Sequence, residues 1–582
     1  MSQKQNQSNP ILDFALSYEY PTYGVEEGMK RVVAFGDHSH KCPTYVQKTP
    51  PCSVGCPANE DIRGIQNILR GVEKSDNKWE TAWRRLVEKN PFPAIMGRVC
   101  PHPCETKCNR EKHDESVSIN AVEHALGEYG IKENLQFIKP THSSGKNVAV
   151  IGGGPAGLSA AYQLRLMGHK VTLFDAQEKL GGMVRYGIMD YRVNRKIMEA
   201  EIQRILNLEI ELKLNTRIGK DISLDDLKKK YDAVFIGIGA QKGRGLPIKG
   251  FDEAESATNA IDFLMDYEKN GKSMRIGKKV LVVGDGNVAM DVARLAIRLG
   301  SEAVIISGVP KEDMGCFPEE FDDAINEGAE IKFLTGTSEV QSEAGKIKAV
   351  KCIQMKLKEK GEEGFNSPIP FFRYKPVEQS DFEISCDMIV ASIGQSTDMA
   401  GFESVTNQAP WLKVNQHYLV QGEEKVFGGG DALKVDLITT AVGHGRKAAE
   451  AIDRYLQGKA QPASEYQDVI QYERLYPYYF LNSAQTKRSH LKLKKVEGNF
   501  EEILISLGDE AIIKESERCM SCGLCIECKQ CTHFCPQEAI SYYKDNPVGE
   551  VMFTDYTKCV GCHICAQVCP TGYIHMGMGE DL

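Results

Sequence analysis

The residues with the most specific chemical spacing are cysteines near the end of the 582-residue chain. They form two runs of the pattern Cys-x2-Cys-x2-Cys-x3-Cys-Pro, which are Cys525, Cys528, Cys531, Cys535 with Pro536, and Cys559, Cys562, Cys565, Cys569 with Pro570. In such paired runs, the fourth cysteine of each run ligates the [4Fe–4S] cluster of the other run. The spacing therefore predicts one cluster on Cys525, Cys528, Cys531 and Cys569, and a second on Cys559, Cys562, Cys565 and Cys535.

Two other interpretations of these runs stay open at the level of spacing. Zinc also binds thiolates, although paired runs that each end in proline are typical of iron–sulfur clusters. Cys519 and Cys522 extend the first run upstream and are surplus to the two predicted clusters. A register that begins at Cys519 is therefore compatible with the spacing.

Cysteine usage over the whole chain also indicates cluster ligation. Of the 19 cysteines, most fall into the C-terminal group or into an N-terminal group of Cys42, Cys52, Cys56, Cys100, Cys104 and Cys108. The N-terminal spacing matches neither the C-terminal runs nor zinc spacing. Cys316, Cys352 and Cys386 stand alone and are predicted to be buried structural thiols. Because the start MSQKQNQSNP has no secretion-signal pattern, we do not expect disulfides.

A glycine-rich stretch, VAVIGGGPAGLSAA, predicts a dinucleotide site. Val148–Ile151 forms a buried strand that breaks into Gly152, Gly154 and Gly157, with Pro155 and Ala156 opening a helix that ends near Gly168. The glycines allow a tight turn, a close approach of the backbone to a pyrophosphate, and close packing of helix on strand. The helix N-terminus offers free N–H groups to the phosphates. The next strand, 170–174, ends in Asp175, where a ribose-binding acid belongs.

The same pattern occurs again about 130 residues later. A strand at 279–283 leads into Gly284, Gly286, Asn287, Val288 and Ala289, followed by a helix with apolar residues at helical spacing and Gly300 at its end. The next strand is expected at 303–306. Two such units predict two dinucleotide sites.

Further elements must position these motifs. We expect helices at 62–72, 80–88, 197–206 and 439–455, and buried strands at 233–236 and 388–392. Gly182 lies in a close-approach turn, Gly239 follows one strand, and Gly430 and Asp431 follow the apolar segment at 426–427. Residues 330–383 alternate apolar and charged side chains and predict antiparallel strands. The first 137 residues are predicted to have a small core of their own.

Length and charge limit the function classes. The length predicts three or four domains, and the net charge of −9 argues against a nucleic-acid partner. No apolar run reaches the ~18 residues that a membrane span needs. We expect a soluble, cytoplasmic protein. No Ser-His-Asp or Cys-His arrangement suggests nucleophilic catalysis, so no catalytic side chain is assigned.

Several motifs together resemble one known family. They are Cys52–Pro57, GRVCPHPCETKC at 97–108, the two glycine turns, and VFGGGDA with TTAVGHGRKAAEAI. They are similar to the small (beta) subunit of glutamate synthase and to the N-terminal half of dihydropyrimidine dehydrogenase. The large subunit of NADH-dependent ferredoxin:NADP oxidoreductase is also similar. So is the flavoprotein associated with dissimilatory sulfite reductase, which likewise carries a C-terminal ferredoxin. The resemblance covers residues 40–460.

This resemblance implies specific roles. The first glycine turn would bind FAD, with Asp175 on the ribose, Asp431 near the ribityl–phosphate region, and Thr440 within the matching motif. The second turn would bind NAD(P)H. The resemblance also implies two N-terminal clusters. One would be held by Cys42, Cys52 and Cys108, and the other by Cys56, Cys100, Cys104 and Glu123. A solvated helix carboxylate is the ordinary alternative for Glu123.

The chain departs from the family at two places. Relatives place a closely spaced cysteine pair before the residue equivalent to Cys52, whereas only Cys42 is available here. His38 and His40 are candidate replacements, or that cluster is altered or absent. Relatives that use NADPH carry Tyr-Arg-Arg after the second-fold strand, where this chain has Ser307, Gly308 and Val309. NADH is therefore favoured, and Lys311 keeps NADPH open.

The predicted fold is multidomain: an α-helical iron–sulfur domain, two Rossmann-like α/β domains with one inserted in the other, and an α+β bacterial-type ferredoxin domain. The expected boundaries are 1–140 for the iron–sulfur domain, 145–255 and 393–460 for the FAD domain, 256–392 for the inserted NAD(P) domain, 461–510 for a connector, and 511–582 for the ferredoxin domain.

The expected function is electron transfer from NADH or NADPH through FAD and [4Fe–4S] clusters to a partner catalytic subunit or ferredoxin. The alternatives are a stand-alone or bifurcating NAD(P)H:ferredoxin oxidoreductase and a redox-sensing scaffold. No residue in the chain identifies the terminal acceptor or the direction of electron flow.

Overall fold

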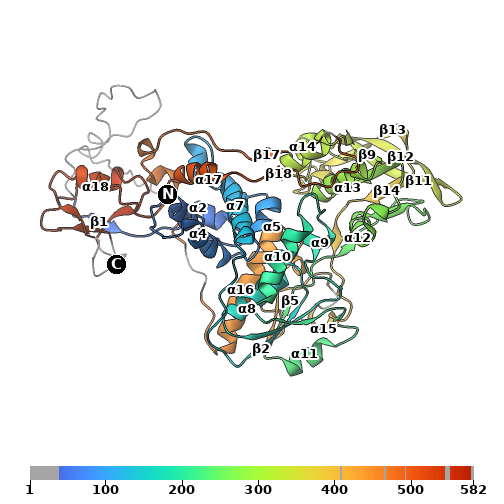
Figure 1. Ribbon diagram of the computed structural model, residues 1–582. Coiled ribbons are helices and arrows are strands. Elements are labelled where there is room, and N and C mark those ends of the chain that lie inside the picture. The colour runs from blue at the N-terminus through green and yellow to red at the C-terminus, as the bar shows by residue number, and fades with distance from the viewer. Residues whose placement is uncertain are drawn as a thin grey trace, which may run out of the picture.

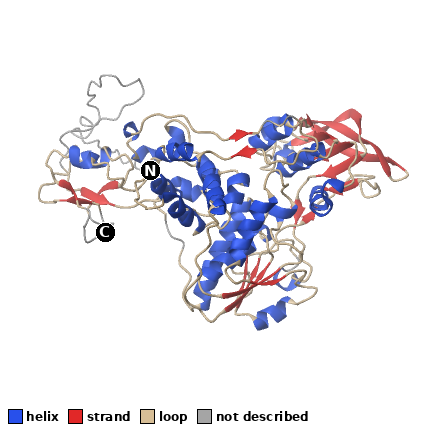
Figure 2. Ribbon diagram, in the orientation of Figure 1, coloured by secondary structure: helices blue, strands red, loops and turns tan. Residues whose placement is uncertain are grey.

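The computed structural model describes residues 39–406, 409–463, 467–491, 493, 495–543 and 551–578. A helical centre lies between a small C-terminal lobe that contains α18 and β1 and two sheet-containing lobes, one around β5 and one around β9 (Figure 1). The lobe around β5 has a sheet covered by long helices, and the lobe around β9 carries an additional sheet at its outer end (Figure 2). The chain therefore folds into distinct parts around one helical hub.

The helical centre is built from short helices, three of which begin with proline. Proline suits the first helical position because its fixed φ is already helical and its missing N–H is not needed there. Side chains of Asp61 and Asn77 cap two others, accepting from the N–H groups of Gly64 (3.0 Å) and Glu80 (3.2 Å). The helices are α2 (Pro51–Gly55), α3 (Ile62–Leu69), α4 (Lys78–Val87), α5 (Pro93–Val99), α6 (Pro103–Thr106) and α7 (Ile119–Lys132).

The first nucleotide-binding fold has a five-stranded parallel sheet in the order β16-β5-β2-β3-β4. Its strands are β2 (Asn147–Ile151), β3 (Lys170–Phe174), β4 (Glu211–Lys213), β5 (Ala233–Ile236) and β16 (Val426–Gly428). Its helices are α8 (Pro155–Leu166), α9 (Met183–Tyr186), α10 (Arg195–Leu206), α11 (Leu224–Lys230) and α16 (Ile438–Leu456). The chain leaves this sheet after β5 and returns to it at β16, so another fold is inserted between them.

The inserted fold has its own five-stranded parallel sheet, in the order β10-β9-β8-β14-β7. The elements are β7 (Ala257–Asn259), α12 (Ala260–Asn270), β8 (Lys279–Val283), α13 (Asn287–Arg298), β9 (Glu302–Ile306), α14 (Pro318–Asn326), β10 (Glu330–Lys332) and β14 (Met388–Ala391). An antiparallel sheet follows with β11 (Thr335–Glu343), β12 (Lys346–Leu357) and β13 (Tyr374–Ser385). The two short strands β6 (Lys242–Gly243) and β15 (Gln395–Ser396) pair where the chain crosses between the folds.

One strand differs from its predicted setting. The segment 330–383 was expected to be wholly antiparallel, but β10 pairs in parallel with β9 at the edge of the nucleotide-binding sheet. Alternation of apolar and charged residues does not distinguish an exposed parallel edge from an antiparallel hairpin, because both have one covered face.

The C-terminal part contains β17 (Ser489–His490), β18 (Leu504–Ile505), α17 (Asp509–Glu517), α18 (Gln530–His533), β19 (Ile540–Tyr542), β20 (Met552–Thr554), α19 (Ile564–Gln567) and β21 (Ile574–Gly577). The early strand β1 (Cys42–Tyr45) pairs antiparallel with β21. The helix α17 packs against α7 and α3. Although residues from 511 onward were predicted to form the ferredoxin domain, α17 therefore packs on the helical centre.

The hydrophobic core crosses the predicted domain boundary. Buried side chains of the helical centre, such as Ile65 and Trp83, belong to one cluster with Leu164 of α8, Val442 of α16 and Ile512 of α17. The prediction that the first 137 residues have a core of their own is wrong. Close packing explains this: a Cβ on Gly443 of α16 would overlap with the carbonyl oxygen of Pro57.

Candidate nucleotide and iron–sulfur sites

A cavity of about 560 Å³ lies at the carboxyl ends of β2, β3 and β5. Parallel α/β sheets bind their ligands at this edge. The predicted residues that line the cavity are Gly152, Gly154, Pro155, Ala156, Asp175, Gly182, Gly239 and Asp431. The first glycine turn and its acid therefore face one space.

The Asp175 carboxylate is held firmly by the backbone around it. Oδ2 accepts from the N–H of Gly153 at 2.6 Å and Oδ1 from the N–H of Gln177 at 2.7 Å. Burial raises the pKa of this carboxyl above its usual range, while the two N–H donors lower it. A carboxylate fixed in this way at the end of β3 can accept hydrogen bonds from ribose hydroxyls.

Three predicted cofactor residues support the cavity without lining it. A Cβ on Gly157 would overlap with the carbonyl oxygen of Gly152, so this glycine allows α8 to approach the turn. Gly430 has a φ of +67° and donates its N–H to Nδ1 of His444 at 3.3 Å. Thr440 lies in the first turn of α16, between the lining residues Ile438 and Ala441.

Asp431 also lines the cavity. Burial raises its pKa to about 6. Its Oδ1 accepts from the N–H of Asp436 at 3.3 Å, and the nearby Asp436 carboxylate raises the pKa further. A polar ligand group beside this carboxylate would compensate its burial.

The second glycine turn joins β8 to α13. Gly284 has a φ of +136°, and a Cβ on Gly286 would meet open space. The Asn287 side chain accepts from the N–H of Phe317 at 2.8 Å, while Ala289 is buried in the helix. Asp285 Oδ2 accepts from the Ser307 hydroxyl at 3.3 Å. Gly286 thus leaves open space beside the N-terminal turn of α13, which includes Val288, and helix N-termini of this kind bind phosphate groups.

The cations near the end of β9 already have partners. Lys311 Nζ lies 4.2 Å from the ring centroid of Phe321, and Arg373 Nη2 lies 3.0 Å from Asp313 Oδ1. Ser307 and Val309 are buried. The arginine pair that grips a 2′-phosphate in the NADPH-using relatives has no counterpart in Ser307, Gly308 and Val309.

The first thiol group of the helical centre contains Cys56, Cys100 and Cys104. Burial is the largest cause that raises the pKa of each thiol, and the neighbouring carboxylates of Glu60 and Glu123 add to it for Cys56 and Cys100. The structure therefore places Glu123 beside these cysteines, as the family resemblance implies. The side chain is buried, which removes the solvated-carboxylate alternative.

Glu60 is a carboxylate of this group that the spacing of the cysteines does not reveal. Asn90 Nδ2 donates to Glu60 Oε1 at 2.9 Å and to Glu123 Oε1 at 2.8 Å. Burial raises the pKa of Glu60 to about 7, and it raises that of Glu123 well above its usual value. In the sequence, the only signal for Glu60 is its position four residues after Cys56, at the end of a Cys-Pro turn.

Cys42 lies elsewhere than predicted. It was expected beside Cys52 and Cys108, but it lies on β1 opposite Gly577, and its thiol interacts with that of Cys559. The pairing of β1 with β21 brings it to the C-terminal lobe. His40 is exposed, and His38 lies outside the described residues.

Cys52 and Cys108 form a second thiol group, and their neighbours come from the far end of the chain. Burial raises the pKa of Cys52, and the next largest contributions come from Cys108, Cys519 and Cys522. Asn109 Nδ2 donates to Cys522 Sγ at 3.6 Å. The two surplus cysteines thus lie in the helical centre.

The C-terminal lobe has two small cavities lined by the predicted cross-ligating sets. One is lined by Cys525, Cys528, Cys531 and Cys569, and the other by Cys535, Cys559, Cys562 and Cys565. In each set, the fourth cysteine comes from the other run. All 19 cysteines of the chain are free thiols. Among the described residues, no three His, Cys, Asp or Glu side chains converge on a position for a single metal ion.

Two dinucleotide turns and several groups of buried thiols in one chain define the class: a nucleotide-dependent redox protein with iron–sulfur domains. Residues 146–445 match the family model of the pyridine nucleotide-disulphide oxidoreductases. Residues 25–135 match dihydropyrimidine dehydrogenase domain II, 4Fe-4S cluster, and residues 524–573 match the 4Fe-4S dicluster domain. The chain belongs to the pyridine nucleotide-disulphide oxidoreductase family and carries 4Fe–4S domains at both ends.

Curated relatives agree with this assignment. The chain is 35% identical over 445 residues to the NADP(+)-dependent formate dehydrogenase subunit beta of Moorella thermoacetica, covering 72% of this chain and 61% of that protein. It is 31% identical over 516 residues to the NADPH-Fe(3+) oxidoreductase subunit beta of Geobacter sulfurreducens, covering 81% and 75%. It is 31% identical over 460 residues to the glutamate synthase [NADPH] small chain of Bacillus subtilis, covering 71% and 89%.

The predicted resemblance, the multidomain fold class, and the FAD-, NAD(P)- and 4Fe–4S-binding character are confirmed by these matches. The chain is an oxidoreductase of this kind. Within the part of the chain that the structure describes, no helix has the length and apolar character needed to cross a membrane.

Proposed function

We propose that this chain is the electron-input subunit of a larger enzyme, which oxidises NADH at FAD and passes single electrons through its clusters to a catalytic partner. One observation carries this proposal. In the first turn of α16, Ile438 and Ala441 line the cavity, while Thr439 Oγ1 lies 3.5 Å from Cys100 Sγ. A single helical turn thus separates the dinucleotide cavity from the first thiol group.

The residues of the chain fit the groups that the family implies. FAD would supply the adaptor chemistry, because it accepts the hydride of NAD(P)H as two electrons and returns them one at a time, with release of a proton. Gly152, Gly154 and the N-terminus of α8 would hold its pyrophosphate, and Asp175 would orient the ribose. Buried thiols and the Glu60–Glu123 pair provide the donor set that clusters need.

NADH is the proposed reductant. The three relatives described above are named for NADP or NADPH, and an NAD-dependent dihydropyrimidine dehydrogenase subunit is also similar, at 30% identity over 415 residues in Escherichia coli O157:H7. The end of β9 carries Ser307, Gly308 and Val309 where arginines would grip a 2′-phosphate, and Lys311 packs on Phe321. We expect kcat/KM for flavin reduction to be at least about tenfold higher with NADH than with NADPH.

A partner subunit is the proposed acceptor. The described relatives are named as subunits or as a small chain. All cysteines are free, and cluster ligands persist as thiols in a reducing compartment, so we place the protein in the cytoplasm.

The test is untagged anaerobic purification from the native host, with mass-spectrometric identification of what remains bound. A stoichiometric catalytic subunit would support the electron-input function and name the reaction. A chain that purifies alone and reduces ferredoxin with NADH at a useful rate would instead make it a stand-alone oxidoreductase. Failure of NADH and NADPH to reduce the bound flavin would leave a redox-sensing scaffold.

A further inference from the structure

We infer that Cys519 and Cys522, together with Cys52 and Cys108, hold a cluster that bridges the helical centre and the ferredoxin lobe. The four thiols come from segments more than 400 positions apart in the chain. This ligand set replaces the N-terminal cysteine pair that the relatives use and that this chain lacks. It goes beyond the proposed function, and its test is independent of NADH oxidation.

The first argument is the mutual position of the four thiols. Burial is the largest cause that raises the pKa of Cys522, to about 12, and the thiols of Cys519 and Cys108 come next. Burial likewise raises the pKa of Cys108 to about 11, with Cys519 among the contributors. Asn109, which follows Cys108, donates to Cys522 Sγ at 3.6 Å. Each of the four thiols is therefore in electrostatic range of the other three, and Cys52, Cys108 and Cys519 pack against the same buried hydrophobic cluster.

The second argument is that the surroundings fit a cluster. The Ser521 N–H donates to Cys519 Sγ at 3.4 Å, and Ser521 adopts a φ of +48°. The Arg63 guanidinium is in electrostatic range of Cys52, Cys519 and Cys522. N–H donors to sulfur and a nearby cation stabilise the negative charge of thiolate-ligated iron.

The third argument is the way in which the segment of Cys519 and Cys522 is anchored. Arg70 Nη1 donates to the carbonyl of Cys519 at 2.6 Å, and Arg63 Nη1 donates to that of Cys522 at 2.7 Å. The Ser521 hydroxyl donates to Asn67 Oδ1 at 2.5 Å. Helix α3 and its C-cap residue Arg70 therefore hold the segment from Cys519 to Cys522 in place.

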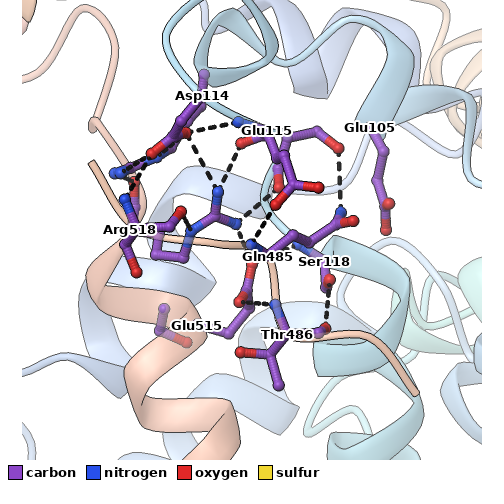
Figure 3. Close-up of polar contacts among 12 residues, drawn as sticks. Glu105, Asp114, Glu115, Ser118, Gln485, Thr486, Glu515 and Arg518 are labelled. Atoms are coloured by element: carbon purple, nitrogen blue, oxygen red, sulfur yellow. Dashed lines mark hydrogen bonds and ion pairs between the residues drawn. The ribbon is translucent and has the colours of Figure 1, made fainter. Parts of the chain in front are cut away.

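A network just upstream completes this anchoring (Figure 3). The buried Arg518 donates to Glu515 Oε1 at 2.6 Å, to the Ser116 carbonyl at 2.7 Å and to Asp114 Oδ1 at 3.2 Å. Glu515 in turn accepts from the N–H groups of Ser118 (2.8 Å) and Thr486 (2.9 Å). The residues on the N-terminal side belong to the loop that follows Cys108, so the network locks the two cysteine-bearing segments together.

The position of this group suggests its role as a bridge. Cys52 and Cys56 are joined by one hydrogen-bonded turn of α2, at 3.0 Å between the Cys56 N and the Cys52 O. At the other side, Cys522 and Cys525 are three residues apart, a span of at most about 11 Å. The bridging group therefore lies between the thiols next to the flavin cavity and the first ferredoxin set.

The test compares two double variants of the full-length protein purified anaerobically. Cys519→Ala/Cys522→Ala should lose about a quarter of the iron and acid-labile sulfide, because one of four clusters is missing. The matched control, Cys316→Ala/Cys352→Ala, should keep all of it. Full iron in the first variant, or loss of a cluster only in the control, would overturn the inference.

Electron paramagnetic resonance of the reduced protein assigns the lost cluster. Cys52→Ala should remove the same signal as the Cys519/Cys522 double variant, and Cys525→Ala should remove a different one. If the double variant instead removes the Cys525 signal, the two cysteines belong to the ferredoxin run and the inference is wrong. Should the double variant fail to fold, Cys522→Ser, which keeps an oxygen ligand, must alter that same Cys52-dependent signal. Flavin reduction by NADH is recorded separately and reports only on the proposed function.

Discussion

At the scale of single residues, Asp431 and the Glu60–Glu123 pair stand out because burial is the largest cause that raises the pKa of all three carboxyls, and the Arg488 guanidinium near Glu123 does not offset it. Burial of a charge is tolerated where a ligand later satisfies it, and such groups gather at functional sites. Asp431 lines the cavity at the first glycine turn, and the two glutamates lie near Cys56 and Cys100. The carboxyls therefore mark the two ends of the short path from cavity to first thiol group.

For Asp431→Asn, we expect weaker FAD binding but a more stable flavin-free protein. The folded-state pKa of about 6 lies above the usual 3.8, so the native chain holds a proton that the unfolded chain releases between these values. Stability is therefore lost as pH rises through this window, and the variant avoids that loss. Thermal unfolding of the flavin-free proteins should show a gain for the variant that is full at pH 8 and smaller at pH 5. An equal gain at both values would contradict this assignment.

Substitutions of Glu60 and Glu123 should show which of the two carboxylates ligates a cluster. Glu123→Ala should lower the iron content by about one cluster of four, whereas Glu123→Gln should keep it, since an amide oxygen remains in place. Glu60→Ala should keep its iron, because Glu123 supplies the oxygen ligand. Iron analysis of the three purified variants checks this, and iron loss in Glu60→Ala with full iron in Glu123→Ala would make Glu60 the ligand.

At the scale of elements, the two glycine turns share a pattern but differ in packing. The helix α8 touches the turn through Gly157, whereas the equivalent position in α13 is Ala289, which already carries a Cβ. Conversely, a Cβ on Gly286 would enter open space at the second turn. One turn is thus closed by packing, and the other is open toward its ligand.

Alanine at these glycines should therefore have opposite effects. Gly157→Ala should disrupt the contact of α8 with β2, lower the thermal midpoint and yield protein without flavin. Gly286→Ala should fold and keep FAD but raise the KM for NADH by at least about tenfold, because its methyl group occupies the space of the pyrophosphate. Flavin content and steady-state kinetics distinguish the two, and normal kinetics for Gly286→Ala would contradict the second site.

At the scale of the whole molecule, the connector and α17 bind the two ends of the chain to one core. Arg518 makes its contacts while only 3% exposed, and its carbonyl accepts from Arg110. Ser483 also accepts from Arg518 Nε, at 3.0 Å, so one guanidinium joins α17, the connector and the loop after Cys108. Removing one partner of a buried charged network leaves the others uncompensated.

Arg518→Ala should accordingly destabilise the docking of the C-terminal part by about 3–5 kcal/mol. Lys112→Ala is the matched control, since Lys112 joins the same regions through an exposed pair with Glu473 at 2.9 Å and should cost at most about 1 kcal/mol. Thermal unfolding and limited proteolysis of the connector provide the measurements. Equal behaviour of the two variants would show that the network does not hold the lobes together.

Much of the local structure follows from the sequence, because short-range patterns determine it. The strands at 170–174, 233–236 and 279–283 were predicted with the observed bounds, since apolar runs bounded by glycine or polar residues have few alternatives. The grouping of the two C-terminal cysteine runs also followed from spacing. In contrast, the burial of Glu60 and the parallel pairing of β10 depend on neighbours distant in sequence.

The sequence by itself determined the class of this protein, because glycine turns and cysteine runs place their ligands within a few residues of one another. Only the tertiary structure decided which distant thiols meet. The pairing of β1 with β21 places Cys42 beside Cys559. The packing of α17 and its arginine network places Cys519 and Cys522 near Cys52 and Cys108. The spacing of cysteines along the chain cannot predict these contacts, because they depend on the packing of segments separated by hundreds of residues.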